Sequence, residues 1–260
     1  MIINPYIFGG YDADALAFFT ATGITDTSIK NCVNTFVLDL KAAGIWTKMK
    51  AIYPFVGGTA TTHKFNLKNP ADTDAAFRLT FNGGWTHSST GALPNGSTGY
   101  ANSHFNPSTD VTISSFSLGY YSRTNNLSGV QIEIGSYNIG TDRTAQVIGY
   151  LAGFAYCQPN SQGVVFSIPQ TRSDGFYLGS RTYSNNLYFQ RNATQTTNTE
   201  TNGAPNNVIY IGARNSTGTP QYYSSRELAL AFLGDGLSTS EGSSLYTIVN
   251  TFQTCLGRNV

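Results

Sequence analysis

Apolar positions divide the chain into a short helical part and a long β-type part. Between residues 26 and 43, apolar side chains recur every three or four positions, which places them on one face of a helix. The apolar positions are Ile29, Cys32, Val33, Phe36, Val37 and Leu40. Thr25 or Asp26 can cap this helix, and Gly44 can end it in the left-handed conformation that glycine adopts readily. Such a stripe must pack on the rest of this chain or on a neighbouring subunit.

A shorter helical pattern precedes this one. In residues 12–23, "DADALAFFTATG", Leu16 and Phe19 fall on one side, and Gly23 ends the pattern. Together the two patterns predict an N-terminal helical segment over residues 1–45.

From residue 46 onward the chain consists of short runs of β-branched and aromatic residues. Asn, Gly, Ser, Asp or Pro separates most of these runs, as expected for turns between strands. The runs cover residues 76–81, 111–123, 129–137, 145–156, 163–170, 174–182, 186–192, 207–214 and 227–234. Nine or more short strands with hairpin-like connections are typical of an antiparallel β-sandwich, here a domain over residues 46–260. Two polar stretches, 82–110 and 190–207, are predicted to be loops.

The end of the chain carries the signature of a closing helix. Ser238 is followed three residues later by Glu241, the spacing of a capping box. Apolar residues then recur at helical spacing until Gly257. The sequence therefore predicts a short C-terminal helix over residues 239–256. Asp235 and Gly236 are then the turn that leaves the last strand, rather than part of a calcium site.

Composition and charge exclude several classes of partner. Charged residues make up only 11% of the chain and the formal net charge is +1, without a basic run. We therefore expect no nucleic-acid partner and no membrane insertion, because no apolar run reaches the ~18 residues that a span needs. The start of the chain lacks the pattern of a secretory signal. The three cysteines are widely spaced, and we expect them to be buried free thiols.

Two resemblances add to this interpretation. Residues 173–194, "SDGFYLGSRTYSNNLYFQRNAT", and residues 207–258 resemble the second half of concanavalin A-like lectin/glucanase domains of the laminin G type. The whole chain is also similar to virion-associated proteins of tailed bacteriophages that infect Bacteroidetes-type hosts. This similarity includes "VLDLKAAGIWTKMKAIYPFVGGTATTHKFNLKNP" and "FRLTFNGGWTHSSTGALPNGSTGYANSHFNP". The resemblances imply a jelly-roll sandwich in a virion, assembled in the host cytoplasm with other virion proteins and copies of itself.

The residues that could carry out catalysis are sparse. Glucanases with this fold place their acids on one strand in an E-x-D-x-E pattern, whereas here Glu133 stands alone. We expect Glu133 on the solvent side of its strand and predict no enzymatic activity. The histidines His63, His87 and His104 lack metal-ligand spacing, and whether His87 and His104, which flank one loop, converge depends on the fold. No metal and no cofactor is predicted.

Sugar binding is the chemistry that remains. Aromatic rings stack on the CH faces of sugars, and amide groups bond to sugar hydroxyls. The candidate residues lie in or beside 82–110 and in a later turn: Trp85, His87, Asn95, Tyr100, Asn102, Tyr222 and Tyr223. In the alternative interpretation, Trp85 and Tyr100 bury their rings against the sheet and only anchor their own loop.

The sequence thus supports two hypotheses about function. The first is a non-enzymatic bacteriophage structural protein of the capsid, fibre or tail. The alternative is a host-surface adhesin or receptor-binding protein that binds host-cell polysaccharide through the loops of the sandwich. An exposed helical stripe would favour assembly.

Overall fold

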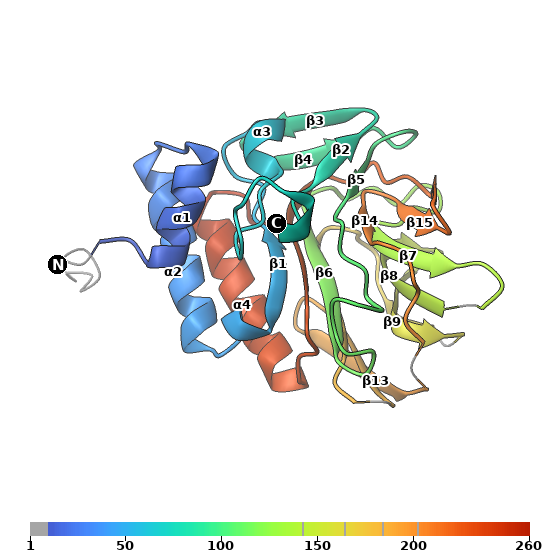
Figure 1. The fold of residues 1–260 in the computed structure, drawn as a ribbon. Helices are drawn as coiled ribbons and strands as arrows, with labels where there is room; N and C mark the ends of the chain where they lie inside the picture. The colour runs from blue at the N-terminus through green and yellow to red at the C-terminus, as the bar shows by residue number, and fades with distance from the viewer. Residues whose placement is uncertain (1–9, 142, 164, 184, 202) are drawn as a thin grey trace.

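Two β-sheets lie face to face, and helices cover the outer face of one of them (Figure 1). The computed structural model describes residues 10–141, 143–163, 165–183, 185–201 and 203–260. Three layers follow one another: helices, a first sheet and a second sheet.

Sheet 1 is the middle layer. It has the strand order β13-β12-β11-β6-β17-β4-β3, and β1 pairs with β17 beside this path. Its strands are β1 (Met49–Tyr53), β3 (Trp85–Ser88), β4 (Gly91–Pro94), β6 (Phe116–Ser122), β11 (Gly175–Arg181), β12 (Asn186–Arg191), β13 (Thr194–Thr199) and β17 (Leu228–Gly234). Both faces of the central strands are buried, so β17 reads as the continuous apolar run "LALAFLG".

Sheet 2 is the outer layer. It has the order β10-β9-β8-β7-β14-β5-β2, and β15 and β16 join it beside β7. Its strands are β2 (Thr80–Asn82), β5 (Tyr100–Asn102), β7 (Ile134–Asn138), β8 (Arg143–Leu151), β9 (Phe154–Gln162), β10 (Phe166–Pro169), β14 (Tyr210–Ile211), β15 (Arg214–Ser216) and β16 (Thr219–Gln221). The pairings are antiparallel, except that β15 runs parallel to β7.

One hydrophobic core fills the space between the sheets. Leu118 and Tyr120 of β6 enter it from sheet 1, and Ile134 of β7 and Val147 of β8 enter it from sheet 2. Successive strand residues point to opposite faces, so alternate positions of sheet 2 are left on its outer side. The predicted mainly-β fold, a lectin-like jelly-roll sandwich with helices near both ends of the chain, is confirmed.

The helical layer packs on the other face of sheet 1. It consists of α1 (Ala13–Thr22), α2 (Thr27–Ala42) and α4 (Thr239–Cys255), while α3 (Ala60–His63), η2 (Trp46–Lys48) and η3 (Asp74–Ala76) are short turns of helix. Asp26 caps α2, its side chain accepting from the Ile29 amide. The predicted stripe of α2 is buried, and Phe36 stacks on Phe252 of α4 with ring centroids 4.4 Å apart.

The predicted segment 1–45 therefore contacts the sandwich domain directly. The stripe of α2 shares one hydrophobic cluster with α4 and with Phe176 and Phe232 of sheet 1. It is not available as an assembly surface in this chain. The first nine positions of the predicted segment lie outside the described residues.

The expectation of three free thiols is wrong for two of them. Cys32 of α2 and Cys255 at the end of α4 form a disulfide, and Cys157 is the buried free cysteine. The two cysteines are 223 residues apart in sequence, so their spacing gave no sign that the two helices would pack side by side.

The expectation of long loops was also wrong in part. Residues 82–110 contain β3, β4 and β5, and residues 190–207 contain the edge strand β13. Polar residues dominate these short strands, so they lack the apolar alternation on which strand prediction depends.

The capping box at the closing helix is confirmed. The Ser238 hydroxyl accepts from the Glu241 amide at 3.3 Å, and the Glu241 carboxylate accepts from the Ser238 amide at 2.8 Å. Asp235 leaves β17 and forms an ion pair with Lys50 at 3.1 Å. In the described part of the chain, no helix is long and apolar enough to cross a membrane.

Candidate functional site

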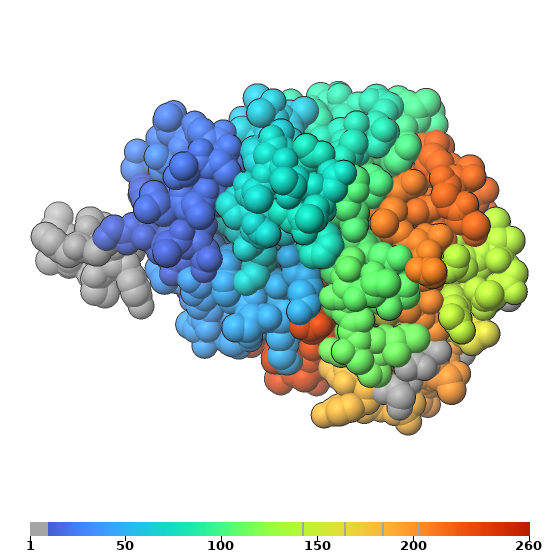
Figure 2. All heavy atoms as spheres, viewed as in Figure 1, coloured from blue at the N-terminus to red at the C-terminus, as the bar shows by residue number. Residues whose placement is uncertain are grey.

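The outer face of sheet 2 carries a group of tyrosines. We call it the tyrosine face and define it by Tyr100, Tyr137, Tyr210, Tyr222 and Tyr223. It lies on the side of the molecule opposite the helical layer. In Figures 1 and 2 the segments around residues 135–150 and 205–225 lie side by side there, in yellow-green and orange.

Strand alternation places the central ring of this face. Ile209 and Ile211 enter the core between the sheets, so Tyr210 between them points outward. Tyr210 lies opposite Asn102 of β5 and Gly135 of β7 in the hydrogen-bonded register. The outward positions of three neighbouring strands thus meet at Tyr210.

Tyr100 and Tyr223 flank Tyr210. The rings of Tyr100 and Tyr210 have centroids 4.6 Å apart and are tilted by 33°. Burial is the largest cause that raises the pKa of Tyr210, and the nearby Tyr100 and Tyr223 raise it further. Tyr210 is only 8% exposed, whereas Tyr100 and Tyr223 are half-buried and present part of their rings to solvent.

Arg214 lies between two other rings of the tyrosine face. Its guanidinium is 4.6 Å from the ring centroid of Tyr137 and 4.6 Å from that of Tyr222. Its Nε donates to the Ser216 hydroxyl at 2.9 Å, and Nη2 reaches Gln221 Oε1 at 3.4 Å. Burial lowers the pKa of Arg214, but a guanidinium stays charged at neutral pH. No carboxylate of the described residues lies within 4.0 Å of it.

The backbone at Tyr222 supports this arrangement. Its φ of 55° is in the left-handed region, which is uncommon for a bulky residue. The Tyr222 carbonyl accepts from the Ile132 amide at 2.9 Å and is thereby fixed to the strand region of sheet 2. The residue is 43% exposed, so the tyrosine that contacts Arg214 is also open to solvent. Strained backbone of this kind is often found at binding sites.

Four of the seven predicted sugar-binding residues meet at the tyrosine face. Tyr100, Tyr222 and Tyr223 belong to it, and Asn102 is the cross-strand neighbour of Tyr210. The Asn102 side chain accepts from the His104 amide at 2.8 Å, which leaves its NH2 group as a possible donor.

The other three predicted residues have structural roles. Trp85 packs against the core between the sheets and donates its indole N–H to the Asn82 carbonyl at 3.1 Å. Its ring also lies against Gly212, where a Cβ atom would come within 2.8 Å of it. The Asn95 carboxamide oxygen accepts from three backbone amides of its own turn, those of residues 97, 98 and 99. For Trp85, these contacts are those expected in the alternative interpretation of an anchoring ring, although the side chain is only partly buried.

His87 and His104, which flank one loop, do not converge on each other. His87 contacts His63, with Nδ1 atoms 3.0 Å apart, while His104 contacts Thr80 at 2.8 Å. Burial is the main cause that lowers the pKa of His63 to about 3, and His87 and Arg258 lower it further. Within the described ranges, no group of three or more metal-binding side chains is present.

The sequence predicted Glu133 on the solvent side of a strand, and this prediction is wrong. Glu133 is fully buried and forms an ion pair with Arg226, which is also fully buried. Its carboxylate also accepts from the Tyr120 hydroxyl at 3.1 Å and from the Gly149 amide at 2.7 Å. A fully buried carboxylate with these internal partners is not accessible to a substrate.

Tyr137, Tyr210 and Arg214 were missed by reasoning from sequence alone. The alternation in "NVIYIGAR" places Tyr210 on the face opposite Ile209 and Ile211, so that part of the pattern was available. The contact of Arg214 with Tyr137 depends on the pairing of β15 with β7, which joins residues far apart in sequence.

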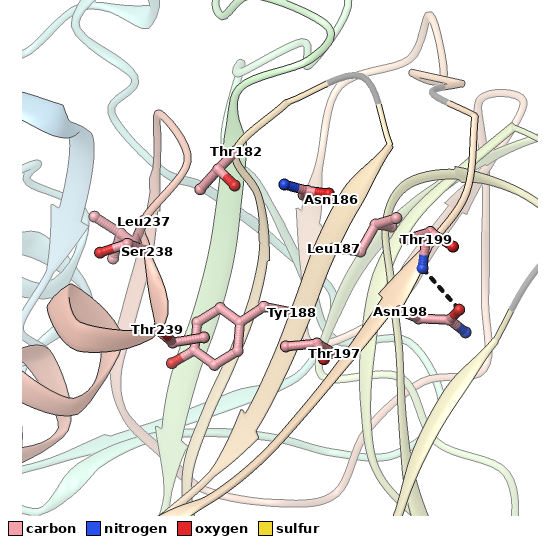
Figure 3. A pocket seen from close by; sticks show the side chains of 10 residues that line it. All are labelled: Thr182, Asn186, Leu187, Tyr188, Thr197, Asn198, Thr199, Leu237, Ser238 and Thr239. Carbon is pink, nitrogen blue, oxygen red and sulfur yellow. Dashed lines mark hydrogen bonds between the residues drawn. The ribbon is translucent and has the colours of Figure 1, made fainter.

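Apart from the tyrosine face, the molecule has a hollow beside sheet 1, at the start of α4. It has a volume of about 540 Å³ and is lined by Thr182, Asn186, Leu187, Tyr188, Thr197, Asn198, Thr199, Leu237, Ser238 and Thr239. Figure 3 shows the ring of Tyr188 between Thr239 and Thr197. All of these side chains are uncharged, and the hollow competes with the tyrosine face as a place for a neutral sugar.

Comparisons with known proteins were made for sequence and for structure. No family model and no curated protein matches the chain. A mutant NanB sialidase from Streptococcus pneumoniae is similar to 63% of this chain and is covered over 27% of its own length, with 14% identity and a TM-score of 0.45. The binding domain of Paraclostridial Mosquitocidal Protein 1 is similar to 77% of this chain and covered over 52%, with 10% identity and a TM-score of 0.48.

A third similar structure is the CBM40 domain of Ruminococcus gnavus IT-sialidase bound to α2,3-sialyllactose. It shares 15% identity with 52% of this chain, is covered over 80% of its own length and has a TM-score of 0.38. At this level of similarity, what those proteins bind carries no weight for this chain. These structures also give no indication of a bacteriophage origin.

Proposed function

We propose that this protein is a non-catalytic carbohydrate-binding protein and that the tyrosine face of sheet 2 is its binding surface. The observation that carries the proposal is the gathering of five tyrosines and Arg214 on one outer sheet face. Sugars offer CH faces to rings and hydroxyls to polar groups, and a ring-lined face bordered by Asn102 supplies both.

A non-catalytic role is supported by the placement of the acids. Glycosidic cleavage needs two carboxyl groups about 5 to 10 Å apart across the bond. The carboxylate of Glu133 is enclosed by Arg226 and Tyr120 and has no access to the tyrosine face.

The place of action is a further part of the proposal. A disulfide between Cys32 and Cys255 persists in oxidising surroundings and is rare in reducing cytoplasm. We therefore propose that the protein acts outside the cytoplasm, on a particle or cell surface. The bacteriophage virion remains a proposal that rests on the resemblance of the sequence. The burial of the α2 stripe removes the feature that would have favoured a purely structural role.

Binding of the full chain to a glycan array, followed by calorimetry on the best ligand, tests this function. Loss of a stacked ring weakens sugar binding, and we expect Tyr222→Ala to lower the affinity about 10-fold. Tyr183→Ala is the matched control, because Tyr183 is 68% exposed and lies beside the start of α4. Thr197→Arg fills the competing hollow with a large side chain.

We expect wild type, Tyr183→Ala and Thr197→Arg to bind the same glycan equally well. The proposal is wrong if the wild-type chain gives no saccharide-dependent signal. It is also wrong if Thr197→Arg abolishes binding while Tyr222→Ala leaves it unchanged, since the hollow would then be the site.

A further inference from the structure

We infer that the sugar bound at the tyrosine face is acidic and that Arg214 binds its carboxylate. This inference rests on the proposed function and adds the chemical class of the ligand. It follows from the position of one cation within a group of rings, without an acidic partner from the described part of the chain.

The two rings orient the guanidinium. The rings of Tyr137 and Tyr222 both lie 4.6 Å from the guanidinium carbon and restrict the side chain, whose N–H edge forms the hydrogen bonds. The edge of a guanidinium carries N–H groups in a fixed fork that matches the two oxygens of a carboxylate. Because the rings already restrict the side chain, little rotamer freedom is lost when an anion binds.

The internal hydrogen bonds of Arg214 leave part of this fork for a ligand. Nε is engaged by the Ser216 hydroxyl, and the Nη2 contact with Gln221 is long, at 3.4 Å. The Tyr222 side chain, besides its ring contact, also forms a hydrogen bond with the guanidinium. A carboxylate at the Nη1–Nη2 edge would form two parallel charge-assisted bonds, which are stronger than the neutral contacts with Gln221 and Tyr222 that they would replace.

Other arginines have either an acidic partner or backbone carbonyls as acceptors; the buried Arg258, for example, donates to the carbonyls of Phe55 and Ala229. Arg226 is paired with Glu133, Arg172 with Asp174 and Arg123 with Glu227. Arg214 instead carries its charge partly buried against rings, and removal from water without an opposite charge is unfavourable. A ligand that supplies the opposite charge offsets this cost.

The neighbouring rings indicate that the anion belongs to a sugar. Tyr210 lies opposite Gly135, and Arg214 pairs with that same residue in the parallel ladder. A free inorganic anion would bind to the guanidinium without contacting the rings, whereas an acidic sugar would contact both. Two kinds of sugar carry the carboxylate: uronic acids and nonulosonic acids.

Calorimetric titration of the full chain with matched oligosaccharides tests the inference. One arm uses an oligosaccharide of uronic acids and its carboxyl-reduced neutral counterpart. The other arm uses a nonulosonic acid-terminated oligosaccharide and its carboxyl-reduced counterpart. We expect the wild type to bind the acidic member of at least one pair about 10-fold or more tightly than the neutral member. This preference shrinks when salt rises from about 20 to about 500 mM.

Two variants assign the preference to Arg214. Arg214→Gln is expected to bind acidic and neutral members equally, at the affinity of the wild type for the neutral sugar. Arg214→Lys keeps the charge but loses the fork, so it recovers only part of the preference. Arg172→Gln is the control, because it removes the same charge from an exposed arginine outside the tyrosine face.

The outcomes separate the two proposals. Equal binding of acidic and neutral members by the wild type overturns the acidic ligand and leaves the carbohydrate-binding function intact. A preference that persists in Arg214→Gln overturns the role of Arg214. Binding of no member of either pair, together with an empty glycan array, overturns the proposed function itself. Thermal unfolding of each variant shows whether a lost signal is only lost folding.

Discussion

Removal of the disulfide between α2 and α4 gives a large and specific change in stability. The perturbation is reduction of the Cys32–Cys255 bond, or the Cys32→Ser variant in which it cannot form. The bond closes a loop over a sequence separation of 223 residues. The chain-entropy relation for such a loop gives about 5 kcal/mol, and measured losses for native disulfides are about 2–5 kcal/mol.

The native helical layer should survive this change. Phe36 and Phe252 hold α2 against α4 by ring stacking, and both are buried in the cluster that covers sheet 1. The loss of stability therefore arises mainly in the unfolded chain, which gains freedom when the link is absent.

Urea unfolding, followed by tryptophan fluorescence with and without reductant, measures the effect. We expect reduction to lower the free energy of unfolding by about 2–5 kcal/mol. Cys157→Ala is the control background, since burial raises the pKa of the Cys157 thiol well above its usual range and keeps it unreactive. The oxidised-minus-reduced difference should be the same with and without this substitution. A difference below about 0.5 kcal/mol would refute the link between the two helices.

Three further predictions concern the helix start, a close contact and pH. Ser238→Ala removes a cap and should cost about 1 kcal/mol equally with and without calcium; strong calcium-dependent stabilisation of the wild type would contradict this. Gly242→Ala usually stabilises a helix, but here its Cβ overlaps the Tyr188 hydroxyl, so we expect a loss of about 1–3 kcal/mol in calorimetric melts. Tyr188→Phe should relieve only part of this loss, because the ring carbon Cζ would still lie 2.6 Å from the new Cβ; stabilisation by Gly242→Ala alone would be the contrary result. The pKa of His63 is about 3 in the fold against 6.5 for the free group, so only the unfolded chain gains this proton as pH falls below 6.5. The contribution of neutral His63 to the free energy of unfolding is complete above pH 6.5 and is lost towards pH 3. The free energy of unfolding should therefore fall by about 2 kcal/mol between about pH 7 and 5. In urea titrations His63→Asn should show a flatter pH dependence; an unchanged slope would contradict the assignment.

Local patterns predicted the parts of this protein that depend on neighbours in sequence. The helix that begins after Asp26 and the one capped by Ser238 follow from spacing of three and four residues and from capping groups. The turn at Asp235 was predicted in the same way, from its position between the last strand and the capping box.

Contacts between distant segments were beyond this reasoning. The bond of Cys32 to Cys255 and the pair of Glu133 with Arg226 join positions that only the completed fold brings together. The edge strand β13, "TQTTNT", has solvent access along most of its length and so lacks an apolar face that would mark it.

The candidate site also contains residues that local patterns indicated and residues that only long-range contacts bring together. Tyr100 and Tyr222 were chosen for their residue type and turn-like surroundings, and the structure places both on one face. Arg214 was passed over because a single arginine in "YIGAR" has no motif around it. Its meaning comes from β15 lying beside β7, which puts the guanidinium next to the Tyr137 ring.

Mapping of the bound sugar by NMR tests the central claim most directly. The experiment titrates 15N-labelled full-length protein with the tightest glycan from the array and follows backbone amides and the Arg214 Nε–H signal. We expect saturable shifts confined to residues 100–102, 134–138, 210–216 and 221–223 and to the Arg214 side chain. Shifts centred on residues 186–199 and 238–239, around the hollow of Figure 3, would contradict it.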